Sequence, residues 1–279
     1  MNKKVLTAQQ LSAFRIWLVE EEKSSATIDK YCRDVRAFLA WAGDCAIDKT
    51  VTVAYKQTLQ EKGYALRSIN SMLASLNTLF TFLGWQECKV KPLRCQRQTY
   101  CDQGQELTKG EYLRLLEAAR NRPQLCMVLQ TICATGIRVS ELRYFTLEAV
   151  RRGEISVRCK SKTRTILIPK QLRNRLLQYA GERRIRSGTI FVTRSGNPLD
   201  RSNIWSQMKK LCAVAGVNPQ KVFPHNLRKL FARTFYNMEK DLAKLADILG
   251  HGSVETTRIY IMTTGTEHRK KLDRLGLIL

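Results

Sequence analysis

Apolar side chains recur at helical spacing through the first part of the chain. Residues 24–43 and 66–85 each place them three or four positions apart, as on one face of an α-helix. Ser24 or Ser25 stands at the start of the first segment, where serine is a favoured N-cap. We therefore predict a helical unit over residues 1–88 with these side chains in its core: Ile28, Tyr31, Val35, Phe38, Leu39, Ile69, Met72, Leu73, Leu76, Leu79 and Phe80.

The helical period is lost after Cys88. The stretch that follows is basic, polar and aperiodic, which indicates an extended linker over residues 89–105. The period then returns, and Thr108 and Glu111 have the spacing of a capping box at the start of a helix. We expect three parts: a helical domain over residues 1–88, a linker over 89–105 and a second domain over 106–279.

Residues 153–160 show a different pattern, in which apolar side chains alternate with polar or cationic ones. This is the period of a β-strand. Residues 163–169 follow after a tight turn, so the two segments predict a hairpin with one apolar and one cationic face. Residues 189–193 precede a turn and are a candidate third strand. The patterns together predict a mainly α fold with a small antiparallel β-sheet.

Net charge narrows the class of partner. The 279 residues include 48 lysines and arginines against 24 acidic residues, a net charge of +24. The excess positive charges repel one another in a compact chain unless a bound polyanion neutralises them. Nucleic acid is the commonest such partner. The excess is small before Cys95, where 14 basic residues face 9 acidic ones, so the second domain is the more cationic.

Several classes of site are missing from the sequence. The nine cysteines are dispersed, with no CxxC pair, and there is no P-loop, HExxH motif or carboxylate cluster suited to Mg²⁺. We therefore expect no metal and no cofactor. No run of about 18 apolar residues and no secretory leader is visible, so we expect no membrane association and a cytoplasmic location.

Three segments of the second domain place cations, imidazoles or a phenol beside helix boundaries. Arg138 follows a glycine in ATGIRVSEL and enters a helix, and His225 and Arg228 share one face of a helix that would start at Pro224. His251 and Tyr260 lie nine residues apart in LGHGSVETTRIYI. Taken singly, each has an ordinary explanation as a surface residue, a cap or a helix end.

Together these side chains suit the cleavage of a phosphodiester without metal. Guanidinium groups match the non-bridging oxygens of phosphate, and a phenol can attack phosphorus when a base or a cationic field activates it. A lysine ammonium can protonate the sugar hydroxyl that leaves. Chemistry without nucleotide or metal indicates a covalent intermediate that stores the energy of the broken bond.

These residues resemble the motifs of the tyrosine recombinase (phage integrase) family. Residues 134–142 resemble its first arginine motif, residues 225–229 its H-x-x-R motif, and residues 249–260 its L-G-H…Y motif. Residues 25–41 and 68–83 resemble its helical N-terminal DNA-clamping (SAM-like) domain. The resemblance covers nearly the whole chain and implies that the second domain is the family's α+β catalytic domain.

The resemblance implies a role for each matching residue. Arg138 and Arg228 would hold the scissile phosphate. His225 would assist proton transfer, and His251 would hydrogen-bond a non-bridging oxygen. Tyr260 would be the nucleophile, forming a 3′-phosphotyrosine and freeing a 5′-hydroxyl.

The catalytic lysine of the family lies on a hairpin with the pattern G-K-G-x-K-x-R. Residues 158–169 resemble this hairpin but are shorter by one residue and lack both glycines. Lys160 is the expected catalytic lysine, and Lys162 is the alternative. Glu141 is expected to support the site without a chemical role.

The expected partner is double-stranded DNA, on which family members form cyclic assemblies, here a homotetramer. The apolar tail then packs on a neighbouring protomer, or alternatively on its own core; its residues are Leu275, Leu277, Ile278 and Leu279. The expected function is site-specific recombination, in integration, excision or resolution of DNA. The alternatives are relaxation of DNA in the manner of a type IB topoisomerase and DNA binding by a non-catalytic regulator.

Overall fold

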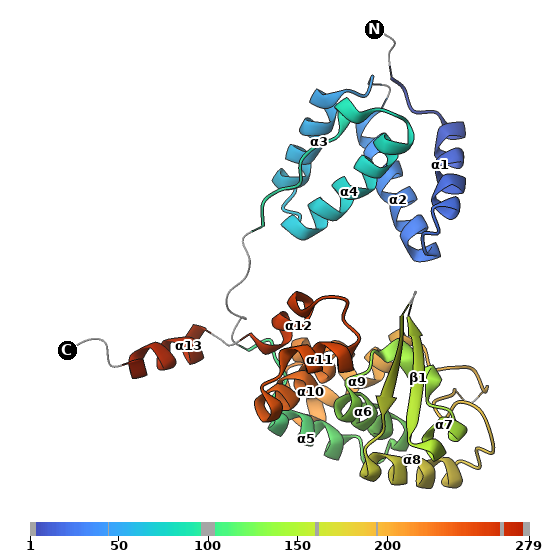
Figure 1. Cartoon of the computed structure of the whole chain (residues 1–279), viewed down its shortest axis with the longest axis vertical. Coiled ribbons are helices and arrows are strands. Elements are labelled where there is room, and N and C mark those ends of the chain that lie inside the picture. The colour runs from blue at the N-terminus through green and yellow to red at the C-terminus, as the bar shows by residue number, and fades with distance from the viewer. Residues whose placement is uncertain are drawn as a thin grey trace. The chain divides into compact units, whose positions relative to one another are not determined.

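The computed structural model describes residues 4–43, 45–95, 104–159, 162–193, 195–262 and 265–275. The chain divides into two compact units, Met1–Arg97 and Gln98–Leu279, each of which is visible as a separate group of elements in Figure 1. No helix among these described residues is long and apolar enough to cross a membrane.

The first unit is a bundle of helices with its own core. Its elements are α1 (Ala8–Glu20), α2 (Ser25–Ala42), α3 (Lys49–Glu61), α4 (Leu66–Phe82) and the short 3₁₀ helix η1 (Gln86–Cys88). Ser24 caps α2, because its side chain accepts a hydrogen bond from the Thr27 amide. The predicted apolar stripes of α2 and α4 line this core; Tyr31, Leu39 and Met72 are only partly buried at its edge.

The chain beyond η1 stays attached to the first unit for several residues. The Asn77 side chain of α4 pairs with both backbone groups of Val90, at 2.9 and 3.0 Å. Asn70, seven residues earlier on α4, pairs in the same way with Leu93, at 2.9 and 2.7 Å. The linker over 89–105 stays a prediction, and its residues 96–103 lie outside the described part of the chain.

The second unit is mainly helical and holds a two-stranded sheet. Its elements are α5 (Lys109–Ala118), α6 (Pro123–Thr135), η2 (Val139–Tyr144), α7 (Leu147–Arg152), β1 (Glu154–Cys159), β2 (Lys162–Leu167), α8 (Lys170–Glu182), α9 (Arg201–Ala215), η3 (Pro219–Lys221), α10 (Pro224–Glu239), α11 (Leu242–Leu249), α12 (Val254–Ile261), α13 (Gly265–Leu272) and η4 (Asp273–Leu275). Thr108 and Glu111 form the predicted capping box of α5, at 3.1 and 2.8 Å.

The predicted hairpin is confirmed, and its apolar face is buried. Strands β1 and β2 pair antiparallel, with Val157 opposite Arg164. Ile155 and Val157 are buried, as is Ile166 on β2. The hairpin lies beside α7 and α8 in Figure 1, and the fold is mainly α with a small antiparallel sheet, as expected.

The third strand predicted over residues 189–193 is wrong. This segment makes only two isolated bridges, Thr189 with Thr146 and Val192 with Pro198. Two backbone bonds hold the second bridge, from the Thr193 amide to the Asn197 carbonyl at 2.7 Å and from the Leu199 amide to the Phe191 carbonyl at 3.3 Å. The chain also turns at once, through Gly196 with φ of 82°, which leaves no length for a paired strand.

Candidate active site

Four separate elements of the second unit bring the predicted residues together. Arg138 precedes η2, Arg228 lies in the first turns of α10, and His251 directly follows α11. His225 on α10 and Tyr260 on α12 complete the group. The helices α10, α11 and α12 lie together in Figure 1, and a cavity of about 230 Å³ opens where they meet the start of η2; its lining is Ile137, Arg138, Val139, Ser140, Arg201, Pro224, His225, Arg228 and Tyr260.

Helix α10 begins at the residue that the sequence indicated. Pro224 is its first residue, where a missing amide hydrogen costs nothing. Two residues on, the buried Asn226 side chain donates to the carbonyl oxygens of Gln105 and Lys221, each at 2.8 Å. These bonds anchor the first turn, which carries His225 and Arg228 on one face.

Arg228 is a charged side chain inside the protein, with 1 % of its surface exposed. Its Nη1 donates to the Gly136 carbonyl at 2.5 Å, and its Nη2 donates to the Leu249 carbonyl at 2.6 Å and to His251 Nε2 at 3.0 Å. Its Nε has no hydrogen-bond partner within the described residues. Burial first, and then the neighbouring Arg138, lower the pKa of Arg228 to about 10, so it stays charged at neutral pH.

The end of α11 meets three arginines at three successive carbonyl groups. Arg164 Nη1 donates to Ile248 at 3.1 Å, Arg228 Nη2 to Leu249, and Arg138 Nη2 to Gly250 at 3.4 Å. These are the carbonyls that a helix leaves unpaired at its negative end. Three guanidinium groups therefore converge on one helix terminus.

The Gly250–His251 pair forms the end of α11. Gly250 adopts the left-handed conformation, with φ of 63°, and ends α11. The His251 amide donates back to the Ala246 carbonyl at 3.0 Å, as in an ordinary helix end. The side chain of His251 meanwhile turns toward Arg228 and Tyr260.

Glu141 is the acidic partner of this arginine cluster. It is 4 % exposed and lies three residues after Arg138. Its carboxylate accepts from the Arg138 amide at 2.7 Å, from Arg138 Nη1 at 3.1 Å and from Arg164 Nη2 at 2.6 Å. One carboxylate facing three guanidinium groups leaves the site with a net positive charge.

The hydrogen bonds of His251 assign its tautomer. Arg228 Nη2 can only donate, so His251 Nε2 accepts, and the proton lies on Nδ1, which is 2.7 Å from Thr257 Oγ1. Burial first, and then Arg228, Arg138 and Arg164, lower the pKa of His251 to about 4. The imidazole is neutral at physiological pH.

Tyr260 lies between the two imidazoles. Its ring centre is 5.2 Å from that of His225 and 5.2 Å from that of His251. It is 4 % exposed and packs against Leu245 and Leu249. Partial desolvation first, and then Lys229 and Arg228, lower the pKa of His225, so this imidazole is neutral at physiological pH.

The expected lysine and most of the tail are outside this description. Lys160 lies outside the described residues, and Lys162 is the first residue of β2. Both assignments stay predictions. The tail residues Leu277, Ile278 and Leu279 also lie outside the described residues, whereas Leu275 is exposed.

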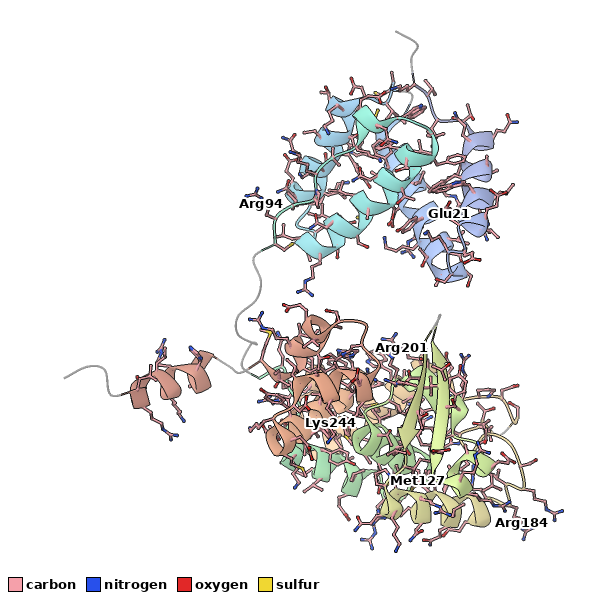
Figure 2. All side chains as sticks on the ribbon, in the orientation of Figure 1. Glu21, Arg94, Met127, Arg184, Arg201 and Lys244 are labelled. Carbon is pink, nitrogen blue, oxygen red and sulfur yellow. The ribbon has the colours of Figure 1, made fainter. Side chains whose placement is uncertain are left out.

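Three residues of the site were not assigned from the sequence. Arg201, labelled in Figure 2, is the first residue of α9 and lines the cavity. Arg164 reaches the site from β2, and Thr257 is fully buried against His251. Arg164 had a local signal in the K-x-R end of the hairpin pattern, at residues 162–164. Thr257 also had one, because it lies three residues before Tyr260 and so shares its helix face.

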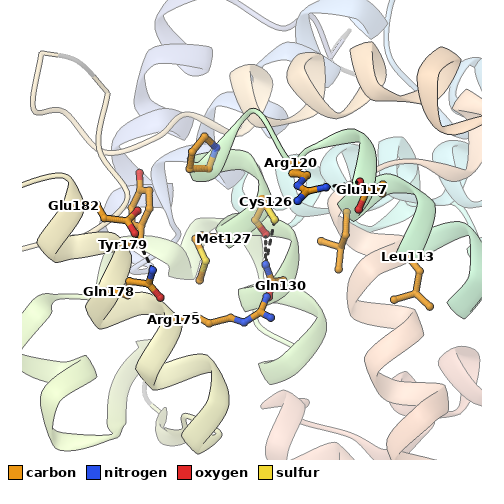
Figure 3. Close-up of a pocket in the computed structure, with 12 residues that line it drawn as sticks. Leu113, Glu117, Arg120, Cys126, Met127, Gln130, Arg175, Gln178, Tyr179 and Glu182 are labelled. Carbon is orange, nitrogen blue, oxygen red and sulfur yellow. Dashed lines mark hydrogen bonds and ion pairs between the residues drawn. The ribbon is translucent and has the colours of Figure 1, made fainter.

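A second cavity, of about 680 Å³, lies between α5, α6 and α8 (Figure 3). Four of its polar side chains form two pairs: Gln130 with Arg175 at 2.7 Å, and Gln178 with Glu182 at 2.9 Å. None of the predicted site residues lines it. Among the described residues there is also no cluster of three or more His, Cys, Asp or Glu that could hold a metal ion.

Comparison with known proteins gives matches over both units. Residues 105–266 match the model of the phage integrase family, and residues 11–87 match that of the phage integrase N-terminal SAM-like domain. Tyrosine recombinase XerA of Thermococcus kodakarensis is 31% identical over 96% of this chain and 95% of its own. Tyrosine recombinase XerD of Xanthomonas campestris is 29% identical over 89% and 85%.

Solved structures show the same fold. A crystal structure of XerA recombinase is 25% identical, with a TM-score of 0.54, over 96% of this chain and 98% of that chain. A lambda integrase dimer bound to a COC′ core site has a TM-score of 0.75 at 17% identity, over 94% and 97%. These matches in sequence and fold span both units, and the chain belongs to the phage integrase family, the tyrosine recombinases.

Proposed function

We propose that this chain cuts and rejoins DNA strands at specific sites through a covalent bond between DNA and Tyr260. The observation that carries the proposal is the position of Tyr260, which lies between two neutral imidazoles at the edge of a cavity lined by Arg138 and Arg228. Membership of the tyrosine recombinase family supports it. The substrate is double-stranded DNA, and its location is with that DNA, in the cytoplasm.

The cavity suits the negative charge of a phosphodiester. Arg138 and Arg228 would hold the two non-bridging oxygens, and the unpartnered Nε of the buried Arg228 is one donor for them. The charge of a bound phosphate offsets the arginines that keep His251 neutral, so the ring can gain a proton and donate from Nε2. The hydrogen bond from His251 Nε2 to the phosphate would replace the present contact of Nε2 with Arg228.

The proposed steps conserve atoms and protons. The phenolic oxygen of Tyr260 attacks phosphorus and gives its proton to His225, while the bond from phosphorus to the 5′ oxygen breaks. The leaving oxygen takes a proton from Lys160, or from Lys162 in the alternative. A 3′-phosphotyrosine and a free 5′-hydroxyl result, and the reverse steps join a new 5′-hydroxyl to the strand.

A nicked duplex tests the proposal, because loss of the short fragment beside the nick prevents rejoining and traps the adduct. The unaltered chain should form a protein–DNA adduct that survives denaturation, and Tyr260→Phe should form none. Tyr236→Phe, on α10 of the same unit, is the matched control and should form the adduct. An adduct with Tyr260→Phe would show that another residue is the nucleophile.

The same experiment separates the other two functions. DNA binding by the unaltered chain without any adduct would identify a binding protein. Adduct formation together with relaxation of supercoiled DNA of any sequence, by single copies of the chain, would identify a topoisomerase.

We further propose that the active form is a homotetramer on DNA, joined by C-terminal tails. One solved relative is a lambda integrase tetramer bound to a Holliday junction. The tail of this chain exposes Leu272 and Leu275. A mainly apolar groove of about 250 Å³ could receive such a tail; it is lined by Lys109, Tyr112, Leu113, Cys133, Leu230, Phe231, Thr234, Phe235 and Met238.

Two variants test the tail contact from both sides. Removing residues 273–279 and, separately, Met238→Lys in the groove should each leave DNA binding intact and reduce assembly of four copies on DNA, measured by light scattering. A tail that packs only on its own chain predicts that both variants assemble normally.

A further inference from the structure

We propose that Arg164 is a positioning residue that holds the catalytic turn carrying His251 and the segment carrying Arg138 against the hairpin. This inference rests on the function proposed above. It concerns the arginine at the K-x-R end of the hairpin pattern, residues 162–164, to which no role has been assigned above.

The position of Arg164 in the sheet requires an explanation. It lies directly opposite Val157, which is 2 % exposed, and two residues before the buried Ile166, on the same face of the strand. Arg164 therefore stands on the apolar face of the hairpin, where an unpaired charge would be strongly disfavoured. Only 13% of its side chain is exposed.

Two polar groups from other elements meet the Arg164 guanidinium. Its Nη2 donates to Glu141 Oε2 at 2.6 Å, and its Nη1 donates to the Ile248 carbonyl at 3.1 Å. Glu141 in turn binds both the amide and the side chain of Arg138. A single side chain on β2 thus joins η2 and the end of α11.

The turn at Gly250 is shaped to accept this side chain. A Cβ atom at Gly250 would lie 2.6 Å from both Cδ and Nη1 of Arg164. Glycine is therefore needed here for two reasons: its left-handed backbone and the close approach of the guanidinium. The next residue is His251, so a shift of Arg164 displaces the imidazole that contacts Arg228 and Tyr260.

A lysine could not replace these contacts. The guanidinium is a planar fork that reaches a carboxylate and a carbonyl on different elements at once, whereas an ammonium is a point charge. Arg164→Lys keeps the charge and removes the fork. Catalysis requires the reacting groups to be correctly positioned. A displacement of a catalytic side chain by about 1 Å can therefore lower the rate on the order of 100-fold.

The first test compares cleavage with binding. In single turnovers on the nicked duplex, Arg164→Lys and Arg164→Gln should form the adduct roughly 10- to 100-fold more slowly, with a Kd for DNA within about threefold of the unaltered chain. Arg175→Lys is the matched control, since Arg175 donates to Gln130 away from the site, and its rate should not change. A rate for Arg164→Lys equal to that of the unaltered chain, or an equal loss in Kd, would overturn the proposal.

The second test is a double-mutant cycle with Gly250→Ala. Each single change, Arg164→Ala and Gly250→Ala, should slow adduct formation. The double variant should be no slower than the slower single variant, because removing the guanidinium also removes its clash with the new methyl group. Losses that simply multiply would show that the two residues act independently.

Failure of this inference is distinguishable from failure of the proposed function. If the unaltered chain forms no adduct, the function is wrong. If it forms the adduct and Arg164→Lys does so equally fast, only the role of Arg164 is wrong. Circular dichroism and thermal unfolding show whether a variant is folded, and should Arg164→Gln not fold, the charge-retaining Arg164→Lys decides.

Discussion

At the scale of single residues, the site is organised around cations that have been taken out of water. Arg228 is almost wholly buried, yet its charge meets two helix-end carbonyls and an imidazole. Buried charges persist where such partners surround them, and removal of a partner leaves a costly unpaired charge. The side chains that complete this network should therefore matter for stability as well as for chemistry.

Glu141→Gln tests this at the acidic partner. The change removes the one negative charge that Arg138 and Arg164 share, so the free energy of unfolding of the second unit should fall by roughly 3 kcal/mol. Urea denaturation followed by circular dichroism measures it. Glu117→Gln is the control, because its ion pair with Arg120 is exposed, and the change should cost less than about 1 kcal/mol. Equal effects of the two changes would contradict the prediction.

The neutral His251 predicts a pH dependence of stability. Its pKa is lowered to about 4 in the folded chain, against an ordinary value of 6.5. Within this window the unfolded chain binds a proton that the folded chain does not, so stability is lost as the pH falls from about 6.5 toward 4. Urea denaturation at several pH values should show a shallower loss for His251→Gln than for the unaltered chain. If the free energy of unfolding changes with pH equally in both proteins, His251 does not contribute to the pH dependence of stability.

Local motifs made some of these residues predictable and left others hidden. Arg138, His225, Arg228, His251 and Tyr260 each stood beside a glycine, a proline or a helix boundary, and their joint order matched a family. Arg164 matched the last residue of the hairpin pattern, but its strand neighbours indicate only a face of the hairpin and not what lies opposite that face. Partners distant in sequence, such as Ile248 for Arg164, follow only from the folded chain.

At the scale of elements, two glycine turns position the side chains of Arg138 and His251. Gly136 ends α6 with φ of 63° just before Arg138, and Gly250 ends α11 just before His251. Gly136 also lies so close to the Phe231 ring that a Cβ atom would overlap it. The turn therefore depends on both the backbone and the packing.

Gly136→Ala and Gly216→Ala form a matched pair. Both glycines are left-handed helix ends, but a Cβ atom at Gly216 would meet nothing within 4 Å. Gly216→Ala should cost about 1 kcal/mol of unfolding free energy from backbone strain. Gly136→Ala should cost roughly 1–3 kcal/mol more, because the methyl group overpacks the Phe231 contact. Thermal or urea unfolding compares them, and similar losses would show that packing at Gly136 is not limiting.

Elements with their own end signals were the ones that the sequence predicted well. Ser24 and the Thr108–Glu111 box marked helix starts, and strict alternation marked β1. The segment after Arg138 was expected to be an ordinary helix, but it is the 3₁₀ helix η2. A short α-helix and a short 3₁₀ helix place their apolar side chains at similar spacing, so periodicity does not distinguish the two. Residues 189–193 are of types that favour β-strands, but no neighbouring strand among the described residues pairs with them.

At the scale of the whole molecule, charge governs the proposed encounter with DNA. The net charge of +24 predicts binding that releases counterions from the phosphate backbone. The affinity for duplex DNA should therefore fall by roughly 10³- to 10⁵-fold between about 50 and 200 mM salt, if six to ten phosphates are contacted. Fluorescence anisotropy over a salt series measures the slope. An affinity that is independent of salt would contradict a backbone-binding role.

The covering of Tyr260 has a consequence for the chain when no DNA is present. Only 4 % of this residue meets solvent, so a small reactive molecule diffusing past finds the phenol shielded by its neighbours. Under the proposed mechanism, the phenol would react only with a DNA strand that is bound in the cavity. The proposed nucleophile is therefore protected from side reactions while no DNA is bound.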